Sequence, residues 1–133
     1  MGYPEYKSPK NRVWNWLGST LQEFKVMLLG YRSYTALLSQ TGTDAPTAIV
    51  LENTLQLNPT YFYNGEGAYH IEDLSGLFTT NKTLVLAQGT GSGVISININ
   101  DTTIIEIGCN NINGGLTQDG LLLNAAFEIR VYN

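Results

Sequence analysis

A single histidine limits the acid–base chemistry that this chain of 133 residues can perform. His70 is closely followed by Glu72 and Asp73, two carboxyl groups that could act beside an imidazole. Adjacent residues of a strand point to opposite faces, so Glu72 and Asp73 would not form a catalytic pair. The motifs GxSxG, GxxxxGK[ST] and HExxH are absent. We therefore predict that the chain is not an enzyme and has no catalytic residue, and that His70 is a strand residue beside Tyr61.

The sequence offers little for a metal or a cofactor. One cysteine, Cys109, and one histidine cannot supply a Cys/His zinc site, and a lone cysteine most often behaves as a small buried apolar residue. Asp44, Asp101 and Asp119 fall in predicted loops but lack the spacing of an EF-hand loop. The stretch GTGSG (89–93) has neither the lysine nor the following helix of a phosphate-binding loop. We predict no metal and no cofactor.

Three tyrosines, Tyr61, Tyr63 and Tyr69, lie close together in sequence, with Asn and Asp residues nearby. Aromatic rings beside such polar groups are suited to stacking on sugars, so one interpretation is a module that binds a glycan, such as one on a host surface. The other interpretation is that the tyrosines fill the core of a hairpin.

The N-terminal segment combines aromatic and basic residues with two prolines and no periodicity, so it cannot bury its own rings. Exposed aromatic side chains of this kind often mark a contact site. The candidate partner-binding residues are Tyr3, Tyr6, Lys7, Lys10, Arg12, Trp14 and Trp16. In the alternative interpretation, the two tryptophans fold back onto the rest of the protein.

Charge divides the chain into a basic and an acidic region. Residues 1–32 hold five Lys and Arg against two Asp and Glu, a net charge of +3, whereas residues 33–133 hold two against nine, a net charge of −7. The acidic region disfavours nucleic acid as a partner. No stretch approaches the roughly 18 apolar residues of a membrane span. We expect neither nucleic acid nor a membrane to be the main partner.

The elements that must position these residues are mostly strands. In VISININDTTIIEI (94–107), apolar and polar residues alternate on both sides of Asp101, which predicts a β-hairpin with one apolar face. A three-residue loop, 100–102, would place Ile97 opposite Ile105 and Ile95 opposite Ile107. A loop with an even number of residues would instead bring Glu106 to the apolar face, so an odd number is expected.

A second hairpin is predicted within residues 60–73, turning at Asn64-Gly65. A four-residue loop, 64–67, would place Phe62 opposite Tyr69 and Tyr61 opposite His70. Other strands are expected at 31–40, 47–55, 83–88 and 121–133, and an amphipathic helix at 19–29.

These elements predict an all-β fold, an antiparallel β-sandwich or jelly roll of about eight or nine strands, preceded by an extended arm and one short helix. The expected division is a basic arm with its helix at 1–30 and a β-sandwich module at 31–133.

Parts of residues 30–133 resemble a β-rich module of uncharacterised virion structural proteins from tailed phages and environmental viral sequences. The stretches that carry the resemblance are GYRSYTALLSQTGTDAPTAIVLENTL (30–55), SGLFTTNKT (75–83) and FEIRVYN (127–133). The resemblance implies a location in the virion and a role as a capsid decoration, head-fibre or tail component. It also implies other virion proteins as partners and a homo-oligomer, with a trimer favoured.

Overall fold

The computed structural model describes residues 18–21, 23–24, 27–91 and 93–133. The chain divides into two units, Met1–Tyr31 and Arg32–Asn133. In the first unit, the described residues between 18 and 29 are helical, which agrees with the helix expected at 19–29. Four described apolar side chains of this helical segment are at least half exposed, and Leu29 is 43% exposed. The four are Leu21, Phe24, Met27 and Leu28.

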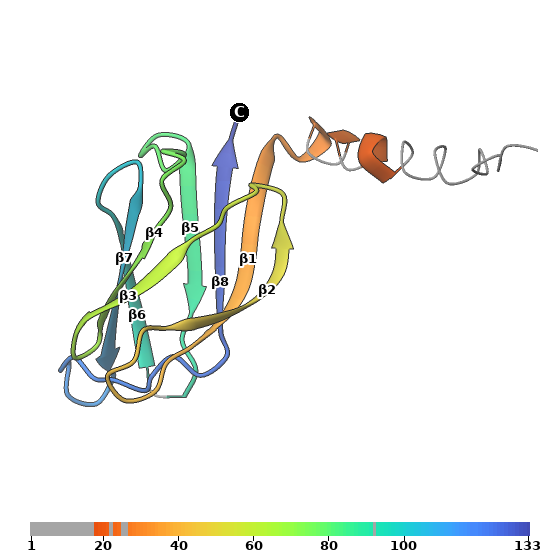
Figure 1. Ribbon diagram of the computed structural model, residues 1–133. Helices are drawn as coiled ribbons and strands as arrows, with labels where there is room; N and C mark the ends of the chain where they lie inside the picture. Colours follow the sequence, from red (N-terminus) through yellow and green to blue (C-terminus); the bar gives the residue numbers. More distant parts are fainter. Residues whose placement is uncertain (1–17, 22, 25–26, 92) are drawn as a thin grey trace, which may run out of the picture. The chain divides into compact units, whose positions relative to one another are not determined.

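Eight strands account for most of the second unit (Figure 1). They are β1 (Tyr31–Ser39), β2 (Thr47–Asn53), β3 (Thr60–Gly65), β4 (Ala68–Glu72), β5 (Thr83–Gln88), β6 (Gly93–Ile99), β7 (Ile104–Asn111) and β8 (Ala125–Tyr132).

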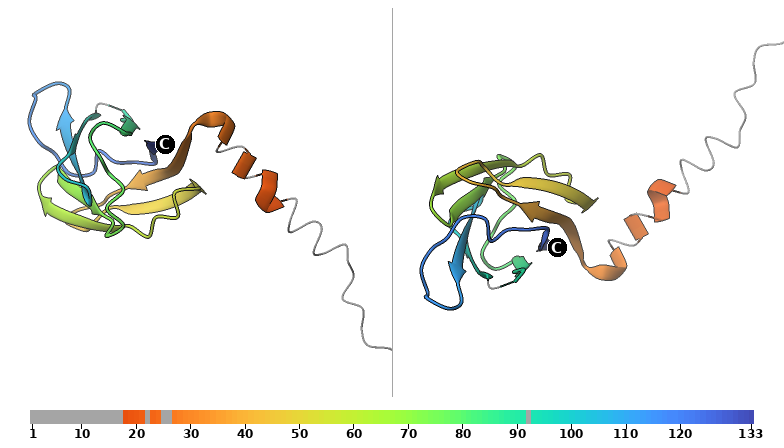
Figure 2. Two further views of the ribbon diagram at one scale, coloured as in Figure 1. Left: turned by 90° about the horizontal axis from the view of Figure 1, so that it is seen from above. Right: turned by 90° about the horizontal axis from the view of Figure 1, so that it is seen from below.

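The strands form two four-stranded antiparallel sheets. Sheet A has the order β2-β1-β8-β5 and sheet B has the order β3-β4-β7-β6. The two sheets form separate layers, seen from the side in Figure 1 and from above and below in Figure 2. Three hairpins, β1–β2, β3–β4 and β6–β7, each stay within one sheet. The predicted all-β sandwich is confirmed.

The core lies between the sheets and is built mainly by alternate residues of the four central strands, β1, β8, β4 and β7. This is the period of two that the sequence shows, with one residue in two turned inward. The buried apolar residues are Tyr34, Ala36, Leu38, Leu55, Leu57, Tyr69, Ile71, Phe78, Ile105, Ile107, Cys109, Leu122, Ala125, Phe127, Ile129 and Val131. Cys109 is a small buried apolar residue, as expected.

The β6–β7 hairpin has the predicted apolar face but a different register. Ile97 lies opposite Ile107 and Ile99 opposite Ile105, so the predicted pairing of Ile97 with Ile105 is wrong by two residues. The carboxylate of Asp101 accepts hydrogen bonds from the backbone N–H groups of Thr103 and Ile104, at 2.7 and 2.9 Å, which stabilises a longer turn. A shift of two residues keeps every isoleucine on its predicted face.

The β3–β4 hairpin also turns later than predicted. Tyr63 lies opposite Tyr69 and Phe62 opposite His70, so the expected pairs Phe62–Tyr69 and Tyr61–His70 are wrong. The turn consists of Glu66 and Gly67, and the register shifts between Tyr63 and Gly65. Gly67 has a φ of +64°, and a Cβ atom there would lie 2.5 Å from the backbone oxygen of Cys109. Only glycine fits this close approach of the turn to β7.

The segment LLLN (121–124), which was expected to be a strand, is not one. Leu122 is buried, and its carbonyl accepts a hydrogen bond from the N–H of Gln40 at 2.9 Å. Asn124 has a φ of +48°, a left-handed conformation that interrupts an extended chain. The last strand therefore begins at Ala125.

Candidate functional site

The three tyrosines proposed to stack on sugars belong to the interior of the sandwich. Tyr69 is only 1% exposed, so it offers no ring face to a ligand, which corrects the sequence interpretation for this residue. Tyr61 and Tyr63 are partly buried and pack against the core. The hydroxyl of Tyr61 is 2.7 Å from that of Tyr34, and burial raises the pKa of both groups.

The other two tyrosine hydroxyls meet at Asp119. Tyr63 and Tyr69 each donate to its carboxylate at 2.9 Å, and the N–H of Gly67 donates at 2.7 Å. Partial burial would raise the pKa of Asp119, but these three hydrogen bonds outweigh it and lower that pKa. Asp119 therefore ties the 112–124 connection to the β3–β4 hairpin. Both of its carboxylate oxygen atoms accept hydrogen bonds in this network, which gives Asp119 a structural role.

Gln40 extends the same network toward sheet A. Its Oε1 accepts hydrogen bonds from the Tyr69 hydroxyl at 3.0 Å and from the Gly120 N–H at 2.8 Å. Its Nε2 donates to the carbonyl oxygen atoms of Gly42 and Asp44. A buried side chain that satisfies both ends of its amide thus joins the loop after β1, the 112–124 connection and strand β4.

His70 does not meet the acidic residues that follow it in a catalytic arrangement. Its ring stacks on Phe62 with a centroid distance of 4.5 Å, and its Nδ1 is 2.9 Å from Oδ1 of Asn64. Asp73 is buried, and its carboxylate accepts the N–H groups of Asn58 and Ser75 at 2.8 and 2.9 Å. The absence of catalysis stays a prediction.

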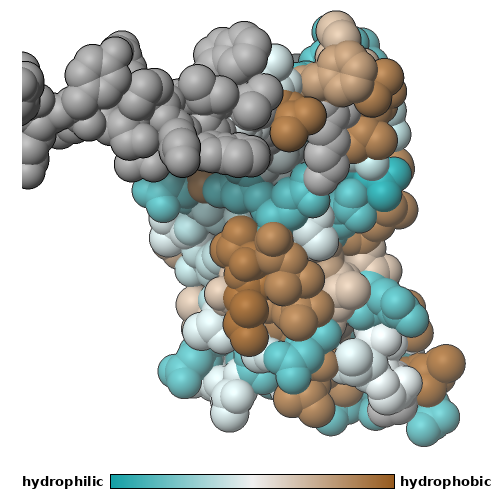
Figure 3. Space-filling model, turned by 90° about the vertical axis from the view of Figure 1, so that its right-hand side faces the viewer, coloured by the Kyte–Doolittle hydropathy of each residue, from teal (hydrophilic) through white to brown (hydrophobic). Residues whose placement is uncertain are grey.

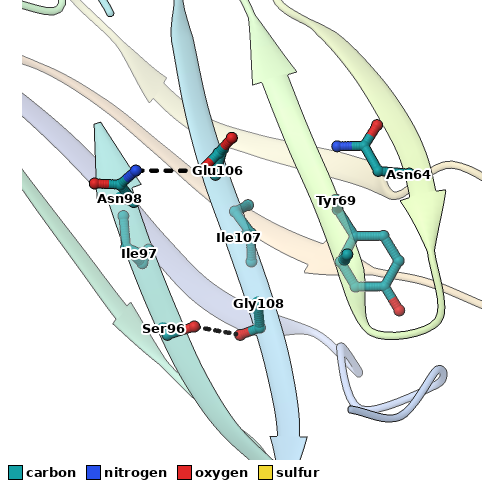
Figure 4. Close-up of a pocket in the computed structure, with 9 residues that line it drawn as sticks. Asn64, Tyr69, Ser96, Ile97, Asn98, Glu106, Ile107 and Gly108 are labelled. Atoms are coloured by element: carbon teal, nitrogen blue, oxygen red, sulfur yellow. Dashed lines mark hydrogen bonds between the residues drawn. The ribbon is translucent and has the colours of Figure 1, made fainter. Parts of the chain in front are cut away.

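The outer face of sheet B carries a row of large side chains that crosses all four strands. Phe62 lies opposite His70, His70 opposite Glu106, and Glu106 opposite Asn98. Directly opposite partners in antiparallel strands are close neighbours on one face. The Asn98 side-chain amide donates to Glu106 at 3.1 Å, as Figure 4 shows on the neighbouring strands β6 and β7.

Next to this row, the same face carries only small residues. Ala68, Gly108 and Ser96 lie opposite one another on β4, β7 and β6. The contrast in size leaves an open hollow of about 360 Å³ above the small row. Asn64, Asn98 and Glu106 are among the residues that line it. Figure 4 shows Ser96 beside Gly108, with Asn98 and Glu106 above them.

Sequence reasoning missed this hollow, although it identified the polar face of β6. The signal is the cross-strand row of Ala68, Gly108 and Ser96, and it becomes visible only when the register of both hairpins is known.

A different surface lies on the edge strand β2 of sheet A. Ile49, Val50 and Leu51 are 60%, 50% and 60% exposed. The register of β1–β2 shifts so that Val50 lies opposite Ala36 and Glu52 opposite Thr35, which leaves Leu51 as an extra residue. This β-bulge interrupts the alternation and exposes three consecutive apolar side chains, here termed the β2 patch. Apolar surface gathers on the side of the sandwich that carries β2 (Figure 3).

The predicted partner-binding residues of the arm lie outside the described residues. They are Tyr3, Tyr6, Lys7, Lys10, Arg12, Trp14 and Trp16. The alternative position of the two tryptophans in the core lies outside them as well.

Within the described ranges, no three His, Cys, Asp or Glu side chains come together as a ligand set for a metal ion. No helix in the described part of the chain is long and apolar enough to cross a membrane.

Comparison with family models, with curated proteins and with solved structures finds no match to this chain. The resemblance of residues 30–133 to virion proteins therefore stays a prediction.

Proposed function

We propose that the protein is a structural component of a virus particle, as a capsid decoration, head-fibre or tail protein, and that it assembles with further copies of itself. The observation that carries the proposal is the β2 patch. The stretch 30–55, which has the most specific resemblance to virion proteins, forms the β1–β2 hairpin and contains this patch.

The β2 patch leaves apolar side chains in contact with water in the single chain, which is unfavourable in free energy. Covering an exposed aliphatic side chain contributes about 1–2 kcal/mol, so Ile49, Val50 and Leu51 together favour association by several kcal/mol. An edge strand also presents unpaired backbone groups, and soluble proteins usually protect such edges with charges, prolines or short strands. β2 has seven residues, and Glu52 is its only charged residue.

The proposed occupant of the patch is the helical segment of a neighbouring copy, whose described residues are 18–21, 23–24 and 27–29. The exposed Leu21, Phe24, Met27 and Leu28 form an apolar surface of matching chemistry. The segment itself has no net charge, with Glu23 against Lys25, but the region 1–32 that contains it carries +3 and residues 33–133 carry −7. Opposite net charges steer two regions toward each other, although they add less to affinity. A head-to-tail contact forms a closed ring, such as a trimer, when the rotation between neighbouring copies closes, and an open filament when it does not. The preceding arm, 1–17, would then attach the oligomer to another virion protein.

Sedimentation of the full chain at tens of micromolar tests the self-association. The expected result is a homo-oligomer, with a trimer favoured, that becomes a monomer in the double variant Ile49→Lys/Leu51→Lys. Val94→Lys is the matched control, since Val94 is also exposed and lies on β6, the edge strand of sheet B. A wild-type protein that sediments as a monomer would exclude this assembly.

A second pair of variants tests the occupant. Phe24→Lys/Leu28→Lys should weaken association as much as the patch variant, and combining all four substitutions should add little, because contacting residues have coupled effects. Additive effects would mean that the helical segment and the β2 patch contact different surfaces. An oligomer that forms as well with Phe24→Lys/Leu28→Lys as without it would show that the helical segment does not join neighbouring copies.

Mass spectrometry of purified particles tests the virion assignment itself. This chain should be present at a constant ratio to the major capsid protein, and cryo-electron microscopy should place it at one repeated position. Particles that lack the chain would refute the assignment without affecting the self-association result.

A further inference from the structure

The hollow on the outer face of sheet B is built by the pattern of side-chain sizes. The row Phe62, His70, Glu106 and Asn98 stands beside the row Ala68, Gly108 and Ser96. The resulting volume of about 360 Å³ lies at the lower end of the range for ligand pockets, roughly 300–1,000 Å³. Its open form suits part of a longer molecule that lies along the sheet.

The polar groups around the hollow are mostly uncharged. Asn64, Ser96 and Asn98 contribute amide and hydroxyl groups, and Gly108 contributes its backbone. These groups match sugar hydroxyls, because each hydroxyl both donates and accepts a hydrogen bond. The floor, at Ala68 and Gly108, carries no polar side-chain atom and suits the C–H face of a sugar ring.

The charge of the hollow selects among ligand classes. Among the described residues that line it there is no lysine or arginine, and Glu106 is the only charged one. A phosphate or carboxylate would therefore meet repulsion without a cation to offset it. A neutral ligand rich in hydroxyl groups has no such penalty.

The polar groups are also held in position before a ligand arrives. The side-chain amide of Asn98 donates to Oε2 of Glu106 at 3.1 Å, and within the described part of the chain Oε1 of Glu106 and Oδ1 of Asn98 have no hydrogen-bond partner. Asn64 fixes His70 through Nδ1 at 2.9 Å, and His70 stacks on the partly exposed Phe62. Fixed side chains lose little conformational freedom on binding, which improves affinity. The stacked rings continue the row of large side chains beyond the residues that line the hollow.

From these features we infer that the outer face of sheet B binds a neutral saccharide, with Asn98, Glu106 and Ser96 as hydrogen-bonding residues. This site is separate from the β2 patch, which belongs to the other sheet. Of the three tyrosines expected from the sequence to bind a glycan, Tyr69 also lines the hollow, but it is only 1% exposed.

The test uses the full chain labelled with ¹⁵N and a panel of neutral hexasaccharides of glucose, mannose, galactose and N-acetylglucosamine. At least one saccharide should give saturable shifts of backbone amide signals, confined to β4, β6 and β7 around the hollow. A neutral peptide of similar size serves as the competing ligand class.

Ser96→Trp fills the hollow from an exposed position of an edge strand, and it should weaken binding at least about tenfold. Gln88→Trp is the matched control, since Gln88 is exposed on β5, the edge strand of sheet A, and this variant should bind as the wild type does. Asn98→Ala gives a second measurement that leaves the hollow open, with an expected weakening of about fivefold.

Three results would overturn the inference. They are no saturable binding by any saccharide of the panel, wild-type affinity in both Ser96→Trp and Asn98→Ala, or binding of the peptide alone. Circular dichroism confirms that each variant is folded, so a loss of binding is not a loss of structure. None of these results depends on whether the chain assembles.

Discussion

The outer faces of the two sheets differ in chemistry, although their inner faces are alike. Both inner faces present alternate apolar residues to one shared core. Outside, sheet A carries the β2 patch and the partly exposed Leu84 and Leu86 on β5. Outside, sheet B carries the row Phe62, His70, Glu106 and Asn98 and the hollow beside it.

This difference shows that folding constrains the inward residues of each strand more than the outward ones. An inward residue must fill the core, whereas an outward residue is free to serve contact with other molecules. Apolar side chains at an edge favour a protein surface that covers them. Amides, a hydroxyl and one carboxylate around a hollow favour a small polar ligand. The two sheets are therefore expected to have separate partners.

The largest effect on the free energy of unfolding is expected at Gly67, in the turn of the β3–β4 hairpin that packs against β7. Gly67→Ala places a Cβ atom 2.5 Å from the Cys109 oxygen and 2.6 Å from the Gln118 nitrogen, at a φ of +64°. The free energy of unfolding should fall by about 3 kcal/mol or more. Gly42→Ala is the matched control, because its φ is +57° with open space around it, and it should lose about 1 kcal/mol. Equal losses in urea denaturation would show that the close approach at Gly67 is unimportant.

The next effect concerns Asp119, which joins the turn of sheet B to the 112–124 connection. Asp119→Ala removes the acceptor for Tyr63, Tyr69 and Gly67, and should lower the free energy of unfolding by about 2 kcal/mol. Asp119→Asn keeps an acceptor and should lose less. Tyr63→Phe removes one of the three bonds and is the smaller control. If Asp119→Ala is as stable as the wild type, the network does not contribute to the free energy of unfolding.

A crossed experiment tests directly whether the two faces act separately. The Ile49→Lys/Leu51→Lys variant should lose association and keep saccharide binding, whereas Ser96→Trp should do the reverse. Each loss should be at least about tenfold, or about 1.4 kcal/mol. Sedimentation and amide-shift titration on the same samples give both values. If either variant impairs both properties, the two faces form one functional surface.

Much of the sandwich could be predicted from the sequence because a one-residue shift in strand register would turn the apolar side chains from the core to the solvent. The alternating isoleucines 95–99 and 105–107 assign each residue to the core or the outside. A two-residue shift changes no face, so hydrophobicity could not determine the register. Asp101 in one hairpin and Gly67 in the other determine it through local hydrogen bonding and close approach.

The functional surfaces were harder to predict because they depend on which residues lie opposite each other. Ala68, Gly108 and Ser96 are far apart in sequence and form one row only in the observed register. The β2 patch depends on a bulge at Leu51 that the apolar run did not indicate. The tyrosines were recognised as a group, but their rings face inward and their hydroxyls bond Tyr34, Gln40 and Asp119.

The smallest effect is expected at Asp101, in the turn of β6–β7. Hydrogen bonds from the backbone and hydroxyl of Thr103 lower the pKa of Asp101, with a further contribution from the Ile104 N–H. The folded protein therefore keeps this carboxylate charged to a lower pH than the unfolded chain, where its pKa is about 3.9. The resulting stability is complete above that value and is lost as the pH falls through the folded pKa.

Asp101→Asn should accordingly be slightly less stable than the wild type at pH 7, and the difference should shrink toward zero in strong acid. Asp73 and Asp119, whose pKa values are also lowered, make both proteins less stable in acid. Only the difference between the two proteins therefore reports on Asp101. Urea denaturation at a series of pH values from neutral to strongly acidic measures it. A constant difference across this range would mean that the turn depends on the shape of the side chain and not on its charge.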